Sequence, residues 1–145
     1  MEYINELINK LGTDNIKYYG RLEPSSKYAQ GITTIVIEDN MHKGPAVYFL
    51  INHHGLLLKV GQTGNLHDRM FRQYKCVVNV TNNRIREHIR SISPLKVYYI
   101  PLEEHVIDKF GYELKTSYSP ALEYHLLKEY KKKYNKLPEL NTMIK

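Results

Sequence analysis

Apolar residues follow a helical period at both ends of the chain. Between residues 4 and 11 they recur at every third or fourth position, and Gly12 is a fitting stop for that helix. Near the other end, Ser119 and Pro120 combine an N-cap residue with a proline at the first helical position, and apolar residues then recur to about Tyr134. The pattern predicts one helix at each end.

Strand-like runs fill the middle of the chain. Val47 to Ile51 is apolar throughout, residues 52–55 have turn chemistry, and Leu56 to Val60 reads as a return strand, so this region predicts a hairpin. Leu95 to Ile100 predicts a third strand. Residues 101–118 show no clear period and are expected to be irregular or mixed.

Two further helices are expected between these strands. Asn65 is a good N-cap residue, and the apolar residues after it fall on one side of the helix that it would start. Thr81 can cap another helix, which contains Ile85 and Ile89. Together the elements predict an α/β (α+β) fold with a small three-stranded antiparallel sheet flanked by helices.

The first 43 residues are predicted to be an extension of this unit. A chain of 145 residues and 17.1 kDa is long enough for one domain with a real core and too short for two ordinary ones. Residues 1–43 hold the opening helix and a β-branched run, Thr33 to Ile37, that suggests a strand. We therefore expect a single domain, residues 1–145, in which this extension packs on a main unit, residues 44–145.

Composition argues against several classes of protein. No apolar run approaches the roughly 20 residues that span a bilayer, and the acidic start, Met1 to Glu6, lacks the basic-then-apolar order of a secretory signal. The protein is expected to be soluble and cytoplasmic. The one cysteine, Cys76, cannot form an internal disulfide or a CxxC pattern, and is interpreted as a small buried apolar residue.

The charge of the chain favours a polyanionic partner. The net charge is +6 and the pI is near 9.3. Basic residues gather in three segments, 69–75, 84–90 and 128–136. Each segment alone is better explained as a solvated helix face, but three of them beside a candidate phosphate site favour nucleic acid.

Glu123 has an unusual position on the last helix. At about 100° per residue it falls between Leu126 and Leu127, inside the apolar stripe. Burying an unpaired carboxylate is costly, so a metal ion, an arginine or several donors would have to meet its charge. The alternative is a first-turn glutamate that favours the helix dipole and reaches outward. The pattern leaves both interpretations open.

Arg69 lies away from the apolar face of its helix, beside Arg72 and one turn before Gln73. A guanidinium suits a phosphate because it donates in a planar fork, and Arg69 and Gln73 can approach the same ligand. Taken alone, Arg69 is better explained as a surface arginine. The loop before it, Gly61 to Gly64, lacks the Gly-Lys-Ser/Thr ending of a nucleotide phosphate loop, which disfavours nucleotide-triphosphate hydrolysis.

The order of these residues resembles the GIY-YIG nuclease superfamily. In that family a strand ending in Gly-Ile-Tyr is followed by Tyr-Ile-Gly, then by a loop and helix of the form Gly-x-Ser/Thr-x-Asn-Leu-x-x-Arg, and later by a helix with a glutamate and by an asparagine. The matching segments here, in order, are Ala46-Val47-Tyr48, Lys59-Val60-Gly61, Gly61-Gln62-Thr63-Gly64-Asn65-Leu66-His67-Asp68-Arg69, and the helix that carries Glu123. Tyr48 and Lys59 alternate with aliphatic neighbours, so either could point to the same face. The likeness covers about residues 44–141.

Three positions depart from the family pattern. Ala46 stands for the first glycine, Lys59 for the second tyrosine, and Gln73 for a position that is often His or Tyr. These changes concern the proton path and leave the metal and phosphate ligands in place. The asparagine has two candidates, of which Asn141 in a Pro-x-x-Asn ending is favoured, because Asn135 is a natural helix C-cap.

The resemblance implies hydrolysis of DNA phosphodiesters with one Mg²⁺ or similar hard cation held by Glu123. Arg69 would clamp the scissile phosphate and stabilise its charge in the transition state. Tyr48 is the candidate general base, with Lys59 as the cation that stabilises tyrosinate. Alternatively, a desolvated Lys59 acts as the base itself. The sequence does not choose between them.

Several functions remain open within and beyond the nuclease class. Gln62, Arg72 and Gln73 are the further residues expected to contact DNA. The enzyme could be a restriction, phage, mobile-element or repair-like nuclease, and a restriction enzyme of this size is expected to act as a homodimer. The alternatives are a non-catalytic nucleic-acid-binding module that keeps the nuclease fold, which Lys59 and Gln73 support, and a structural or protein-interaction domain.

Overall fold

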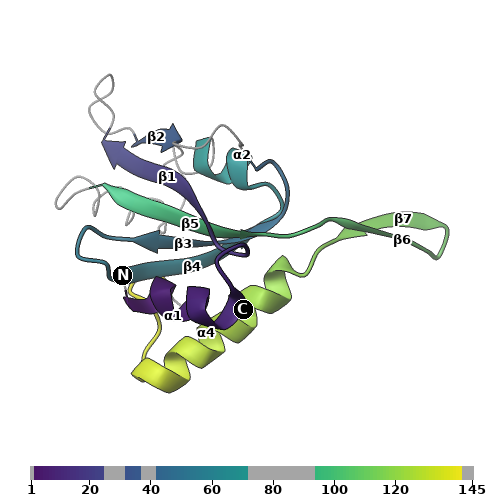
Figure 1. Cartoon of the computed structure of the whole chain (residues 1–145). Coiled ribbons are helices and arrows are strands. Elements are labelled where there is room, and N and C mark those ends of the chain that lie inside the picture. Colours follow the sequence, from purple (N-terminus) through teal and green to yellow (C-terminus); the bar gives the residue numbers. More distant parts are fainter. Residues whose placement is uncertain (1, 25–31, 37–41, 72–93, 142–145) are drawn as a thin grey trace.

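A five-stranded antiparallel sheet forms the centre of the molecule (Figure 1). The computed structural model describes residues 2–24, 32–36, 42–71 and 94–141. In the order β2-β1-β5-β3-β4, the strands are β1 (Lys17–Pro24), β2 (Ile32–Val36), β3 (Ala46–Ile51), β4 (Leu57–Thr63) and β5 (Leu95–Pro101). β3 is therefore an inner strand, and β4 is an edge strand of the sheet.

Helices cover both faces of this sheet. α1 (Glu2–Leu11) and α4 (Ser119–Tyr134) lie on one face, and the short α2 (Leu66–Phe71) lies on the other (Figure 1). Alternate residues of β3 enter two different core clusters. Phe49 packs in the cluster that includes Leu127 of α4, whereas Leu50 packs in the cluster that includes Met70 of α2. A strand buried on both faces reads as a continuous apolar run, which explains the sequence Ala-Val-Tyr-Phe-Leu-Ile.

The predicted α+β class, with an antiparallel sheet flanked by helices, is confirmed. The sheet is larger than the predicted three strands, because the N-terminal extension adds β1 and β2 beside β5. The pairing of β1 with β5 shifts register between Tyr18 and Gly20, so apolar and polar residues do not alternate regularly along β1. A strand was therefore not predicted there. The helix expected after Thr81 lies outside the described residues.

A second sheet replaces the irregular structure expected for residues 101–118. It is a hairpin of β6 (His105–Lys109) and β7 (Tyr112–Thr116), which projects away from the main sheet (Figure 1). The turn residues Phe110 and Gly111 both have positive φ, 55° and 79°, as a tight two-residue hairpin turn requires. The usual Asn-Gly or Asp-Gly signal is absent there, which is why the turn was missed.

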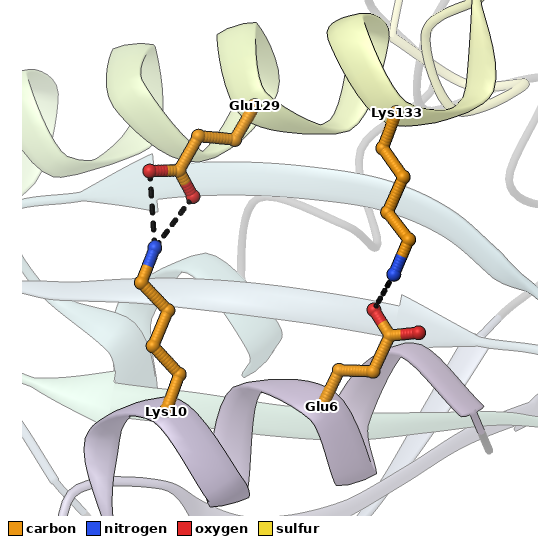
Figure 2. A network of polar contacts seen from close by, with 4 residues as sticks. All are labelled: Glu6, Lys10, Glu129 and Lys133. Carbon is orange, nitrogen blue, oxygen red and sulfur yellow. Dashed lines mark hydrogen bonds and ion pairs between the residues drawn. The ribbon is translucent and has the colours of Figure 1, made fainter.

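Charged pairs and aromatic rings join α1 to α4. Lys10 pairs with Glu129 at 2.9 Å and Lys133 pairs with Glu6 at 2.6 Å, and both pairs bridge the two helices (Figure 2). Exposed ion pairs contribute little, so the burial of Ile4 and Leu7 is the larger contribution to docking α1. Among the described residues, no helix is both long and apolar enough to cross a membrane.

Candidate active site

The phenol group of Tyr48 lies over Gly61 of the neighbouring strand. The two residues are directly opposite in the β3–β4 pairing, and Tyr48 is only 2% exposed. A Cβ placed on Gly61 would lie 2.7 Å from Cε2 of the Tyr48 ring and would overlap the ring carbon and oxygen of the phenol group. Only glycine therefore allows the phenol to lie where it does.

Lys59 lies on the same face of the sheet as Tyr48. It pairs with Leu50, and because side chains alternate along a strand, residues 48 and 50 of β3 and residues 59 and 61 of β4 share one face. Lys59 is partly buried. The register thus brings an aromatic hydroxyl and an ammonium to neighbouring positions above the sheet.

α2 packs on this face and carries Arg69. Asn65 caps the helix as predicted, since its Oδ1 accepts a hydrogen bond from the backbone N–H of Asp68 at 2.9 Å. The Thr63 hydroxyl accepts from the N–H of Asn65 and donates to its carbonyl oxygen, both at 3.1 Å. Leu66 and Met70 are buried in the same cluster as Tyr48. The loop from β4 to α2 is therefore fixed at both ends.

The Arg69 guanidinium has a buried nitrogen for which the described residues supply no acceptor. Its Nε is inaccessible to solvent and makes no hydrogen bond to any residue that the structure describes. Leaving a buried donor unsatisfied costs about 1–3 kcal/mol, and more when the group is charged. Such groups call for an explanation, and a bound anion is one of the standard ones. A phosphate oxygen would supply the acceptor that Nε lacks.

Glu123 comes from the layer on the opposite face of the sheet. It is partly buried in the second turn of α4, and the buried residues Leu126 and Leu127 of that helix pack with Val60 rather than with Tyr48. The start of α4 lies beside the edge strand β4, because the Ser119 hydroxyl donates to the Gln62 side chain of that strand. The structure groups Tyr48, Lys59 and α2 on one face. A meeting of Glu123 with them around the β4 edge stays a prediction.

Gln62 connects that edge to the first turn of α4. The Ser119 hydroxyl donates to Oε1 of Gln62 at 3.2 Å and shares a 2.8 Å hydrogen bond with the Ser117 hydroxyl. Ser119 is the first helical residue and not the N-cap, because Tyr118 holds the cap position without a side-chain hydrogen bond. The prediction of Ser119 as N-cap is therefore wrong by one position, although Pro120 does lie in the first turn.

Asn141 and Asn135 have different surroundings. Oδ1 of Asn141 accepts from the backbone N–H of Val60 at 2.9 Å, and its Nδ2 donates to the Val60 carbonyl at 2.8 Å. Asn135 ends α4 in the left-handed conformation, and its N–H donates to the Lys131 carbonyl at 2.8 Å, which is the predicted C-cap. Arg72 and Gln73 lie outside the described residues.

A second aromatic hydroxyl on the α2 side was missed in the sequence. Tyr19 of β1 is buried in the same cluster as Tyr48, and its hydroxyl lies 3.5 Å from Nδ1 of His67, two residues before Arg69. Burial raises the pKa of Tyr19 to about 12, with a further contribution from Tyr99. No local pattern could reveal this contact, because it depends on β1 joining the sheet.

Among the comparisons with known proteins, the search of solved structures bears on the fold. No protein-family model matches the sequence, and a search of curated proteins gave no match. Two solved structures are similar along almost the whole chain. The restriction endonuclease HPY188I, in complex with product DNA, is 20% identical with a TM-score of 0.61, and the match covers 97% of this chain and 86% of that one. A mutant of bacteriophage T4 EndoII is 18% identical with a TM-score of 0.63, covering 94% and 97%. The chain has the fold of these two proteins.

Proposed function

We propose that the chain is a metal-dependent DNA endonuclease of the GIY-YIG type, which hydrolyses phosphodiester bonds. The observation that carries the proposal is the buried Nε of Arg69, for which the described part of the chain supplies no acceptor. Arg69 belongs to α2, the helix that packs in the core cluster of Tyr48. The order of motifs along the chain supports the same reading, as does the DNA complex of one structural neighbour. DNA is therefore the proposed substrate.

Arg69 has the role of holding the scissile phosphate. A guanidinium donates two parallel hydrogen bonds to phosphate oxygens, and its charge stabilises the negative charge that develops during attack. Burial strengthens both effects because water screens the interaction less. α2 fixes the backbone of Arg69 through the Asn65 cap and through the buried Met70 next to it.

Tyr48 and Lys59 have the role of activating the attacking water. A free tyrosine has a pKa of about 10 and is a poor base at neutral pH, so a nearby cation must stabilise its anion. Lys59 on the same face can do this, or can serve as the base after losing its own proton. Gly61 allows the phenol to lie across β4 and so sets its position.

Glu123 has the role of holding a hard divalent cation such as Mg²⁺. The described residues contain no group of three or more His, Cys, Asp or Glu side chains that could enclose a metal. A single partly buried carboxylate fits Mg²⁺, which is commonly held by one or two carboxylates together with water and substrate phosphate. When bound, the cation would polarise a phosphate oxygen.

A plasmid assay tests the proposal. Wild-type protein is expected to nick or linearise plasmid in the presence of Mg²⁺ and not with EDTA. Arg69→Ala and Glu123→Ala are each expected to lower the rate by at least about 100-fold, as for the removal of one transition-state-stabilising group. Matched controls are Arg21→Ala, which removes an arginine from its ion pair with Glu23, and Glu129→Ala, which removes an exposed α4 glutamate from its ion pair with Lys10; both should cut normally. Normal cutting by either site variant would overturn the assignment.

The second candidate is a nucleic-acid-binding module that keeps the fold without catalysis. Lys59 in place of the second family tyrosine favours it. Such a protein would retard DNA in a gel, with a binding constant that falls steeply with salt, but would not cut it. If the enzyme is of the restriction type, cleavage of both strands calls for a homodimer, and ultracentrifugation with a short duplex would test that step.

A further inference from the structure

The outer edge of β4 is covered by the loop that follows α4. The backbone N–H of Leu140 donates to the Leu58 carbonyl at 2.8 Å. One residue further along, the side-chain amide of Asn141 accepts from the N–H of Val60 and donates to its carbonyl. A residue of a neighbouring antiparallel strand would offer Val60 one backbone donor and one backbone acceptor. The side-chain amide of Asn141 supplies both groups in place of such a strand.

This side chain holds the strand at the centre of the candidate site. Val60 lies between Lys59 and Gly61, and its own side chain is buried on the opposite face. Leu140 is 3% exposed and belongs to the core cluster of Tyr48, which anchors the loop that presents Asn141. The Asn141 N–H also donates to the Pro138 carbonyl at 2.9 Å, which closes the loop into a turn.

We infer that Asn141 is a positioning residue that fixes Lys59 and Gly61 by binding the backbone of Val60 on both sides. Its Oδ1 and its Nδ2 each have a backbone partner, so it serves the site through the strand rather than by touching the substrate. Movement of Val60 would shift Lys59 relative to Tyr48, which lies over Gly61. The inference rests on the proposed nuclease function for its effect on the reaction, but the strand contact can be measured without it.

Three variants separate the contact from its consequence. Asn141→Ala removes both hydrogen bonds, whereas Asn141→Asp keeps the acceptor for the Val60 N–H and loses the donor. Asn135→Ala is the matched control, because it changes the other candidate asparagine at the end of α4. Amide hydrogen exchange at Val60 is expected to accelerate by about 3- to 10-fold in Asn141→Ala, as for the loss of one ordinary hydrogen bond, and to stay unchanged in Asn135→Ala.

The pH–rate profile tests the positioning role. In Asn141→Ala, kcat should fall by about 10-fold or more with little change in KM, since the base is misplaced rather than the substrate released. The shape of the pH–rate profile should change in Asn141→Ala, because the position of Lys59 relative to Tyr48 affects how readily either group gives up its proton, and it should stay as in wild type in Asn135→Ala.

Each outcome bears on a separate statement. Unchanged exchange at Val60 in Asn141→Ala would show that the contact does not hold the strand and would overturn the inference. Faster exchange with an unaltered kcat and pH profile would overturn the positioning role alone. Wild-type protein that fails to cut DNA would instead overturn the proposed function. If Asn141→Ala does not fold, Asn141→Asp gives both readouts.

Discussion

The β3–β4 and β6–β7 hairpins use the same antiparallel pairing but lie in opposite environments. β3 is buried at every position and is covered by helices on both faces. β7 is exposed at every position, and Ile107, Tyr112 and Leu114 on one side of its hairpin are 48%, 69% and 46% exposed. Both hairpins therefore have the backbone hydrogen bonds of an antiparallel pair, and they differ in how deeply their side chains are buried.

This difference accounts for where the candidate site lies. An isolated two-stranded hairpin is marginally stable in water, whereas a strand packed between two layers opens only when the domain unfolds. Catalytic geometry has to be held within a fraction of an ångström, so the buried hairpin suits the roles proposed for Tyr48 and Lys59. The β6–β7 hairpin carries Asp108 and Glu113 against Lys109 and Lys115, so it contributes nothing to the net charge of +6 of the chain.

The largest expected effect compares one leucine from each hairpin. Leu50→Ala should destabilise the protein by about 2–5 kcal/mol, because it leaves a cavity in a fully buried site. Leu114→Ala should change the free energy of unfolding by less than about 0.5 kcal/mol, as for an exposed position. Urea unfolding followed by circular dichroism measures both. Equal losses would mean that the β6–β7 hairpin is packed in solution.

The next effect concerns the close approach of Tyr48 to β4. Gly61→Ala should cost about 1–3 kcal/mol and disturb the site, since a methyl group would overlap the phenol ring. Gly64→Ala is the matched control three residues away, where a Cβ would meet nothing within 4 Å. Thermal unfolding of the two variants side by side checks the prediction, and a Gly61→Ala protein as stable as Gly64→Ala would contradict it.

A smaller effect is expected from buried Tyr19 at high pH. Burial raises the pKa of Tyr19 to about 12 in the folded state, against about 10 when unfolded. The folded state then binds the proton more tightly, so this contribution to stability is complete below pH 10 and declines between about pH 10 and 12. Denaturant midpoints across this range should fall less in Tyr19→Phe than in wild type. Parallel curves for the two proteins would show that Tyr19 has no such role.

The smallest effect on overall stability is expected at the hairpin turn. Gly111→Ala places a side chain at a φ of 79°, which costs about 1–3 kcal/mol locally although the space around it is open. The β6–β7 amides should lose protection against hydrogen exchange while the global midpoint stays within error. A fall in the global midpoint would show that the hairpin and the main sheet unfold together.

The sequence predicted those elements whose burial leaves a periodic mark. The apolar run of β3, the helical stripe of α4 and the Asn65 cap could each be read locally, and each is present. The β6–β7 hairpin could not be predicted in this way, because a strand exposed on both faces does not need alternating apolar and polar residues. β1 was missed because its partners are β2 and β5, and β5 is more than 70 residues away in the chain.

The sequence names candidate residues for the site, but it does not show on which face of the sheet each of them lies. The resemblance of motifs selected Tyr48, Lys59 and Arg69, and register places the first two on one face. The helical pattern left an inward and an outward Glu123 both open, and the side chain is partly buried; the face of the sheet that α4 covers depends on long-range packing. The contact of Asn141 with Val60 spans 81 residues, so no local pattern could have shown it.

The loop that ends in Leu140 and Asn141 has a consequence for solubility. An uncovered sheet edge has unpaired backbone N–H and C=O groups that can pair with a strand of another molecule, and repeated pairing of this kind leads to aggregation. This loop binds the outward-facing backbone groups of Leu58 and Val60, so a strand of another molecule cannot pair with this edge of the main sheet. A protein shortened before Pro138 would therefore be expected to form aggregates even where its remaining core could still fold.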